Sequence, residues 1–324
     1  MSTRLISLGR VALVFPGQGS QRPGMARDFC EQFAVARLVF DEASDALAID
    51  MRALCFEDDA RLNLTEFTQP AILTAEMAMW RALVTDFGLA AANYGGHSLG
   101  EYSALCAAGV IPLADAVRIV RRRGALMQEA VPVGAGAMSA VIASGIAARD
   151  FATDLAGLEV DVANRNSRDQ VVLSGTAPAV AAAGERIRSS LATSASPEIV
   201  PLNVSAPFHS RLMAGIEEEF RGVLMDAAPR FRPEHAGAVT SNFLGGFHRP
   251  TLESLVDALT RQISGSVDWM GNMATLMAVA DRILEIGPNR PLRGFFKAEG
   301  RDITSIISVK TAVALMTAEK ERAA

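Results

Sequence analysis

Residues 93–103 read Asn-Tyr-Gly-Gly-His-Ser-Leu-Gly-Glu-Tyr-Ser and contain a G-x-S-x-G pattern at Gly96, Ser98 and Gly100. Glycines on both sides of a serine allow a strand to turn sharply into a helix and leave the hydroxyl uncovered. The surroundings agree, because residues 92–95 can end a short strand and residues 98–107 have a helical pattern that begins with an acidic first turn. The stretch therefore predicts a nucleophilic serine at a strand–helix turn, although a plain glycine-rich turn would carry the same pattern.

Composition limits the classes of protein that this chain can belong to. Its 324 residues are enough for one large domain or two smaller ones. They are 50% hydrophobic and 21% charged, which is ordinary for a globular protein. A net charge of −5 argues against nucleic acid as a partner. The chain has no run of 18 apolar residues, so we expect no membrane span. The N-terminal ten residues lack the apolar core of a signal peptide. The three cysteines are far apart and have no metal-site spacing, so we expect a reduced, cytoplasmic setting and no metal.

Hydrophobic patterning predicts an α/β fold in two parts. A buried strand at 11–15 is followed by helices at about 25–46, 70–87, 98–107 and 113–130, which is typical of a parallel sheet covered by helices. Residues 136–202 then follow the order β-α-β-β-α-β, the signature of a ferredoxin-like unit, with strands predicted at 136–142, 158–163, 170–174 and 198–202 and helices at 146–155 and 178–191. The α/β pattern returns afterwards, with strands predicted at 237–242 and 282–286. We expect a large domain formed by 1–133 and 204–324, and a small inserted domain formed by 134–203.

A nucleophilic serine needs a base, and the chain has four histidines. His97 is the chain neighbour of Ser98 and cannot easily fold back onto its Oγ, so we expect it to pack beneath the turn. His235 and His248 lie among Pro, Arg and Gly residues and are expected in loops. His209 lies between a strand end and a helix, where it can either project into a cleft or cap the helix.

Two further residues have patterns that suggest chemistry. Arg123 falls within or beside the apolar stripe of the helix at 113–130, and an inward-facing arginine needs an anion or several acceptors. It could form a structural ion pair or bind a substrate carboxylate through two of its guanidinium nitrogens. Gln18 lies in the glycine-rich loop after the first strand, which can offer a backbone N–H to an oxyanion. The loop lacks the G-K-[ST] ending of a nucleotide-binding motif.

Taken together, these segments resemble the malonyl-CoA:acyl carrier protein transacylase family, which includes the fatty-acid synthesis enzyme and the acyltransferases of polyketide synthases. The motifs occur in the family's order over about residues 11–310. They are Phe15-Pro16-Gly17-Gln18-Gly19-Ser20-Gln21, Thr68-Gln69-Pro70-Ala71, Gly96-His97-Ser98-Leu99-Gly100-Glu101-Tyr102, Arg123-Gly124, Asn164 with Asn166, Ala206-Pro207-Phe208-His209-Ser210 and Glu285-Ile286-Gly287-Pro288-Asn289.

The resemblance implies an α/β-hydrolase-like large domain, with a parallel sheet, and a ferredoxin-like small domain. It implies Ser98 as the nucleophile and His209 as its base, oriented by the backbone carbonyl of Gln262 instead of an aspartate. The oxyanion hole would be formed by the backbone N–H groups of Gln18 and Leu99.

The resemblance also implies the substrates. Arg123 would bind the free carboxylate of a malonyl group, and Gln69 and Asn166 would line the pocket. Phe208 resembles the malonyl-selective pattern, whereas Pro207 stands where that pattern usually has Ala. The partners would be malonyl-CoA and an acyl carrier protein, with CoA thioester and phosphopantetheine as substrates, no cofactor, and a monomeric enzyme.

Several alternatives stay open at this point. The chain could be an acyl hydrolase that clears carrier proteins, although the presence of Arg123 argues against it, or a transacylase serving malonate decarboxylase. A silent docking protein for a carrier protein is a third alternative. The pathway, fatty-acid synthesis or a polyketide synthase served in trans, is left undecided. Because carrier proteins are acidic, we expect a basic patch near the cleft mouth that could include Arg121 or Arg122.

Overall fold

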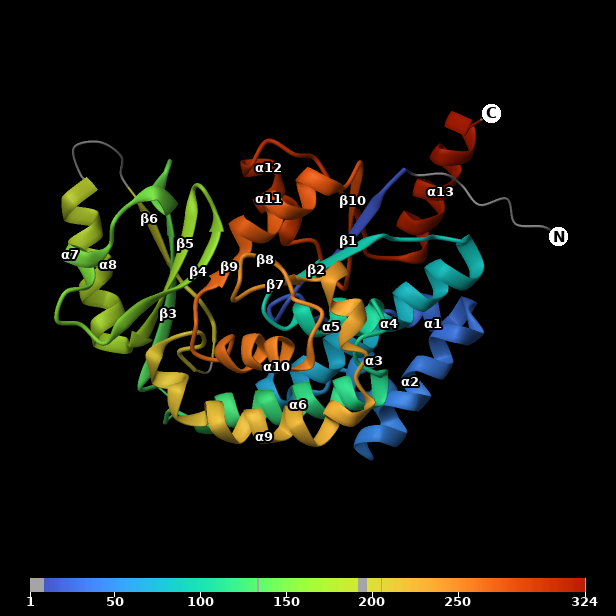
Figure 1. The fold of residues 1–324 in the computed structure, drawn as a ribbon, viewed down its shortest axis with the longest axis horizontal. Helices are drawn as coiled ribbons and strands as arrows, with labels where there is room; N and C mark the ends of the chain where they lie inside the picture. The colour runs from blue at the N-terminus through green and yellow to red at the C-terminus, as the bar shows by residue number, and fades with distance from the viewer. Residues whose placement is uncertain (1–8, 133, 192–196, 205, 324) are drawn as a thin grey trace.

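A computed structural model describes residues 9–132, 134–191, 197–204 and 206–323. The predictions that concern the N-terminal eight residues and the domain boundary at 133 fall outside these residues. Figure 1 shows two sheets, with the larger helical part of the molecule around one of them and a smaller lobe at the left around the other.

The first sheet contains four parallel strands in the order β11-β10-β1-β2. They are β1 (Val11–Phe15), β2 (Asn93–Gly96), β10 (Arg282–Ile286) and β11 (Thr304–Ile306). All five residues of β1 are buried, as expected for a central strand covered by helices on both faces. The strands at 11–15 and 282–286 match their predicted ranges, and β2 lies one residue later than predicted.

Helices surround this sheet, and the longest of those described is α4. Sixteen of the 23 residues of α4 are buried, and it packs against α2 and α6. The helices are α1 (Arg27–Gln32), α2 (Ala34–Leu47), α3 (Met51–Phe56), α4 (Thr65–Phe87), α5 (Gly100–Ala107), α6 (Leu113–Glu129), α9 (Glu217–Ala227), α10 (Leu252–Arg261), α11 (Trp269–Val279), α12 (Leu292–Ala298) and α13 (Val309–Ala323). None of the helices in the described part of the chain is long and apolar enough to cross a membrane.

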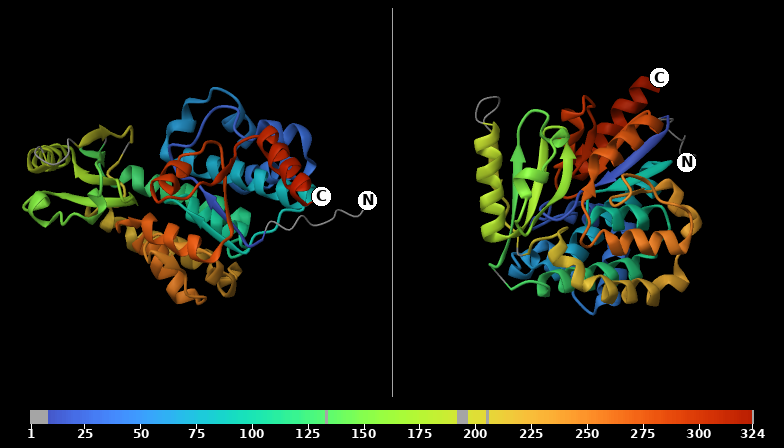
Figure 2. Two further views of the ribbon diagram at one scale, coloured as in Figure 1. Left: turned by 90° about the horizontal axis from the view of Figure 1, so that it is seen from above. Right: turned by 60° about the vertical axis from the view of Figure 1, so that its left-hand side comes forward.

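The second sheet has five strands in the order β6-β3-β5-β4-β9. Four come from one stretch of chain: β3 (Gly136–Ile142), β4 (Val160–Ser167), β5 (Gln170–Thr176) and β6 (Glu198–Pro201). The longer helix on this sheet is α8 (Ala177–Leu191), beside the short α7 (Ala152–Leu155). The fifth strand, β9 (Val267–Asp268), comes from outside residues 134–203 and pairs in parallel with β4. This strand joins the smaller lobe to the chain that leads into α11, and Figure 2 shows the two parts in contact.

Several predicted elements are shorter or interrupted. The helix predicted at 25–46 is broken at Phe33, whose backbone is extended (φ −119°, ψ 124°). The helix predicted at 146–155 is a 3-10 turn (Ile146–Ala148) followed by α7, and the strand predicted at 237–242 is only β7 (Thr240–Ser241), paired with β8 (Gly246–Phe247). In each case the pattern marked an apolar segment correctly but overestimated the length of regular structure.

Candidate active site

The site forms where the loops after β1 and β2 meet. These strands are parallel neighbours with Phe15 opposite Gly96, so their carboxyl ends, and the loops that follow, lie side by side. The approach is close enough to require glycine: a Cβ on Gly100 would lie 2.1 Å from the carbonyl oxygen of Phe15, and one on Gly96 would lie 1.9 Å from that of Gly100. The G-x-S-x-G pattern therefore reflects packing of one backbone segment against another.

The Ser98 backbone adopts a left-handed conformation, with φ +52°. A non-glycine residue rarely occupies this region unless surrounding contacts stabilise it. Asn242 supplies two such contacts: its Oδ1 accepts from Ser98 N at 2.8 Å and its Nδ2 donates to the carbonyl of Gly96 at 2.7 Å. A residue 144 positions away in the chain thus fixes the turn that presents the Ser98 hydroxyl.

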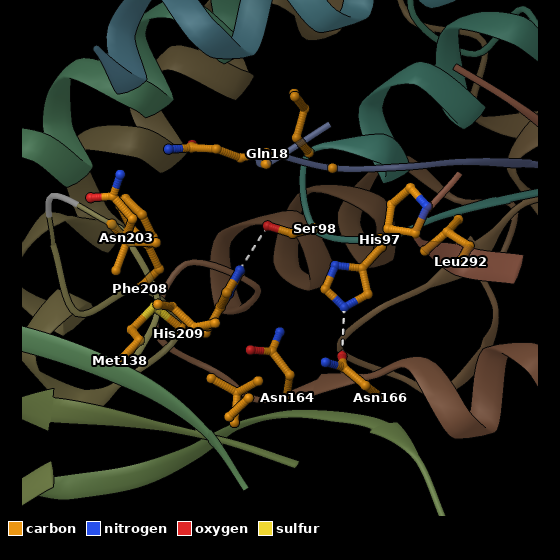
Figure 3. Close-up of a pocket in the computed structure, with 18 of the residues that line it drawn as sticks. Gln18, His97, Ser98, Met138, Asn164, Asn166, Asn203, Phe208, His209 and Leu292 are labelled. Atoms are coloured by element: carbon orange, nitrogen blue, oxygen red, sulfur yellow. Dashed lines mark hydrogen bonds between the residues drawn. The ribbon is translucent and has the colours of Figure 1, made fainter. Parts of the chain in front are cut away.

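Ser98 and His209 form a hydrogen-bonded pair, which Figure 3 shows across the cavity. Ser98 Oγ lies 2.7 Å from His209 Nε2, and His209 Nδ1 donates to the backbone carbonyl of Gln262 at 2.8 Å. Because the carbonyl can only accept, the proton of the neutral ring is on Nδ1, and Nε2 is free to accept from the serine hydroxyl. Burial and the positive charge of Arg123 lower the pKa of His209 to about 3, so the ring is neutral at physiological pH.

Arg123 projects from α6 into the same site and is 1% exposed. Its Nη1 donates to Gln69 Oε1 at 2.9 Å, and its Nη2 donates to Gln262 Oε1 at 2.9 Å and to Ser98 Oγ at 3.2 Å. Its hydrogen-bond partners in the described part of the chain are all neutral, and burial lowers the pKa of the guanidinium. A buried cation that has acceptors but no directly bonded anion is suited to receive an anionic ligand.

A cavity of about 600 Å³ opens in front of these groups, between the two sheets. Strands β3 and β4 supply its wall opposite Ser98, with Met138, Asn164 and Asn166 pointing inward, and Phe208 lies beside His209 (Figure 3). Gln69, Gln18 and Leu99 also line the cavity. The structure therefore brings all nine predicted site residues to one place, with Gln262 reaching it through its hydrogen bonds to His209 and Arg123.

The backbone N–H groups predicted to bind an oxyanion are available. Within the described residues, neither Gln18 N nor Leu99 N donates to a protein acceptor, whereas Ser98 N is already bonded to Asn242. A Cβ on Gly17 would lie 2.4 Å from the carbonyl oxygen of His97, so the two loops touch at this point. Leu99 also stands at the start of α5, where N–H groups favour negative charge.

Two histidines differ from their predictions. His97 does not pack beneath the turn; it lines the cavity, with Nε2 2.8 Å from Asn166 Oδ1 (Figure 3). His235 lies in a short 3-10 helix (Pro233–Ala238) instead of a loop. His248 lies in the loop after β8, as predicted, but it is only 2% exposed and its Nε2 lies 2.8 Å from Glu101 Oε1. The partners of His97 and His248 are distant in the chain, so local sequence does not reveal them.

Two other groups were missed. The carboxylate of Glu101 lies fully buried behind Ser98, and the side chain of Gln262, predicted to act only through its backbone, contacts both Glu101 and Arg123. The one signal in the sequence is the acidic residue itself, which lies in the first turn of a mostly apolar helix and predicts only a favourable charge at the helix N-terminus.

The surface arginines beside Arg123 are paired. Arg121 Nη2 lies 3.0 Å from Glu66, and Arg122 pairs with Glu219. These carboxylates partly neutralise both guanidinium groups. The basic patch expected at the cleft mouth for binding a carrier protein therefore stays a prediction. Among the described residues, no group of three or more His, Cys, Asp or Glu side chains could hold a metal ion.

Comparison with known proteins gives the class first. The model of the acyl transferase domain family matches residues 12–241, so the chain is an acyltransferase. It is 38% identical over 304 residues to a malonyl CoA-acyl carrier protein transacylase of Bacillus subtilis (strain 168), covering 92% of this chain and 93% of that one. It is 40% identical over 290 residues to the enzyme of the same name from Escherichia coli (strain K12), covering 88% and 91%.

Solved structures agree with the sequence relatives. A malonyl CoA-acyl carrier protein transacylase from Clostridium perfringens superposes with a TM-score of 0.87 at 32% identity, covering 97% of this chain and 98% of that one. A malonyl-transacylase in complex with its type II PKS acyl-carrier protein has a TM-score of 0.85 at 35% identity, covering 95% and 99%. The chain belongs to the malonyl CoA-acyl carrier protein transacylase family, which confirms the resemblance inferred from its motifs.

Proposed function

We propose that this enzyme transfers a malonyl group from malonyl-CoA to the phosphopantetheine thiol of an acyl carrier protein, through a malonyl ester on Ser98. The position of Arg123 carries the proposal: its buried guanidinium lies 3.2 Å from the Ser98 Oγ, and its hydrogen-bond partners among the described residues are neutral. A malonyl group differs from an acetyl group by a carboxylate two bonds from the thioester carbonyl. An acyl group on Ser98 would carry that carboxylate into reach of the guanidinium.

The first half-reaction loads the serine. His209 Nε2 accepts the Ser98 proton as Oγ attacks the thioester carbon, and the N–H groups of Gln18 and Leu99 face the oxyanion that forms. The C–S bond then breaks, and CoA leaves with the proton from His209. The second half-reaction reverses these roles: the phosphopantetheine thiol gives its proton to His209 and attacks the ester, and Ser98 leaves and recovers the proton.

The C-terminus of α10 takes the place of an aspartate. Gln262 follows the last residue of α10, and its carbonyl is one of those left without a partner in the helix. The negative end of the helix dipole at this position stabilises a protonated His209 by a smaller amount than a full carboxylate would. A thioester releases a thiolate, which is a better leaving group than an amine, so the reaction needs less stabilisation of the imidazolium.

Phe208 and Asn166 are proposed to shape the acyl pocket, with Gln69 holding Arg123 from one side. Pro207 departs from the usual family pattern, and it packs on β3, where a Cβ on Gly136 would lie 2.3 Å from its Cδ. This contact supports a fixed backbone before Phe208, which lines the cavity.

The finer description of the architecture is also a proposal. The strand order β6-β3-β5-β4 supports a ferredoxin-like small domain at 134–203, and the parallel sheet with its Ser98 turn supports an α/β-hydrolase-like large domain at 1–133 and 204–324. We further propose a monomer that needs no cofactor and works in the cytoplasm.

Intact-protein mass spectrometry tests the function. Incubation with malonyl-CoA should add one malonyl group, and addition of a carrier protein bearing phosphopantetheine should move that group to the carrier. Formation of the adduct mainly from acetyl-CoA, with loss to water instead of transfer, would identify an acyl hydrolase and contradict the proposal.

A further inference from the structure

The side chain of Gln262 has a single orientation. Its Nε2 donates to Glu101 Oε2 at 2.6 Å and to the carbonyl of Ser98 at 3.1 Å, while its Oε1 accepts from Arg123 Nη2 at 2.9 Å. A flipped amide would place an NH₂ against the guanidinium and an oxygen against two acceptors. The contacts therefore fix which end of the amide faces Arg123.

Glu101 is anchored in turn by a buried pair. Its Oε1 lies 2.8 Å from His248 Nε2, and its Oε2 also accepts from Asn242 N at 2.9 Å. Glu101 is fully buried and His248 is 2% exposed, so solvent does not weaken these interactions. In such surroundings a fully bonded carboxylate is strongly held, and the groups bonded to it are held with it.

We propose that the side chain of Gln262, fixed by the Glu101–His248 pair, is a positioning residue that sets Arg123 for the substrate carboxylate. Gln69 and Gln262 each bond one terminal nitrogen of the guanidinium, so the group is oriented before an acyl group arrives. Ordering a long, flexible side chain during binding costs free energy, so a side chain that is already ordered binds its ligand more tightly. This inference rests on the proposed function, because it assigns Gln262 a part in carboxylate recognition.

The two oxygens of Gln262 have separable roles. The backbone oxygen orients His209, and substitution of the side chain leaves it in place. The side-chain oxygen contacts Arg123. A purely structural residue would affect both activities together, whereas a positioning residue for Arg123 affects only the reaction that uses a carboxylate.

Gln262→Met tests this separation with two readouts. Malonylation of Ser98 by malonyl-CoA reports on Arg123, and sulfonylation of Ser98 by phenylmethylsulfonyl fluoride, a neutral reagent, reports on the Ser98–His209 pair alone. We expect the KM for malonyl-CoA to rise by about tenfold or more, and the sulfonylation rate to fall by a much smaller factor, because the bond from Gln262 Nε2 to the Ser98 carbonyl is lost as well. Gln32→Met, a substitution at an exposed glutamine that ends α1, serves as the control.

Gln262→Glu gives an isosteric second test and covers the case in which the methionine variant does not fold. Its carboxylate would pair with Arg123 and face Glu101, so malonylation should fall further at pH 8 and recover towards wild type as the pH falls, since a protonated Glu can again donate to Glu101. Parallel loss of malonylation and sulfonylation, or no change in either, would overturn the positioning role. A wild-type enzyme that is sulfonylated but never malonylated would instead refute the proposed function.

Discussion

Two segments of the chain build the site around Ser98 and contribute different things. Residues 93–103 carry the nucleophile on a turn between β2 and α5. The turn is bounded by glycines and packs closely against the end of β1. Residues 240–262 carry no reacting side chain, yet Asn242 bonds the turn itself and Gln262 bonds both His209 and Arg123. The first segment supplies the reacting serine, and the second holds that serine and its partners in position. Substitutions in the two segments should therefore have different effects on activity and stability.

The largest effect is expected in the first segment. Ser98→Ala removes the only atom proposed to bond the acyl group, so no malonyl adduct should form and transfer should fall by at least about 10⁴-fold. The variant should fold normally, since the hydroxyl points into the cavity. Intact mass after incubation with malonyl-CoA measures the adduct, and an adduct of normal mass on the variant would place the nucleophile elsewhere.

Arg123→Ala should come next, with malonyl transfer losing about 2–5 kcal/mol of transition-state stabilisation because the substrate carboxylate is left unpaired in a buried site. Transfer of acetyl, which has no carboxylate, should change far less. Arg118→Ala is the matched control on the same helix, where the side chain is exposed and lies 3.8 Å from Asp115. Equal losses for malonyl and acetyl would remove the carboxylate role from Arg123.

Asn242→Ala tests the second segment directly. It deletes the two bonds that stabilise the left-handed Ser98 turn, and we expect a loss of about 1–3 kcal/mol in the free energy of unfolding. The rate of Ser98 acylation should fall for malonyl and acetyl alike, because the turn serves both. Denaturant unfolding measures the first quantity, and an unchanged midpoint with unchanged acylation would show that the turn holds its shape without Asn242.

The smallest effect concerns pH. The pKa of His209 is lowered to about 3, so the base stays neutral and the acylation rate should be nearly constant from pH 8 to pH 5. An ordinary histidine, with a pKa near 6.5, would lose about 30-fold over that range. The unfolded chain binds a proton at His209 below pH 6.5 that the folded enzyme does not, so stability falls as the pH drops from 6.5 towards 3. Rapid-mixing measurements therefore give the rate before unfolding, and a loss of tenfold by pH 5 would contradict the depressed pKa.

The same contrast explains what the sequence could predict. The Ser98 turn was predictable because its requirements are local: glycines at fixed spacing, a strand before and a helix after. His209, Arg123 and the backbone of Gln262 were placed in the site by family resemblance, and the structure brings them together.

The support around those residues was not predictable. Glu101 and His248 meet across 147 positions of chain, and β9 joins the second sheet from a segment far outside it. Short elements such as β7 and β8 exist because of tertiary pairing and leave little periodic signal.

A crystal structure of the enzyme after reaction with malonyl-CoA is the most direct test of the central claim. The account predicts an ester on Ser98 Oγ, with the free carboxylate bonded to Arg123 and the ester carbonyl directed at the N–H groups of Gln18 and Leu99. An ester whose carboxylate turns towards solvent, with Arg123 still bonded only to Gln69 and Gln262, would contradict it.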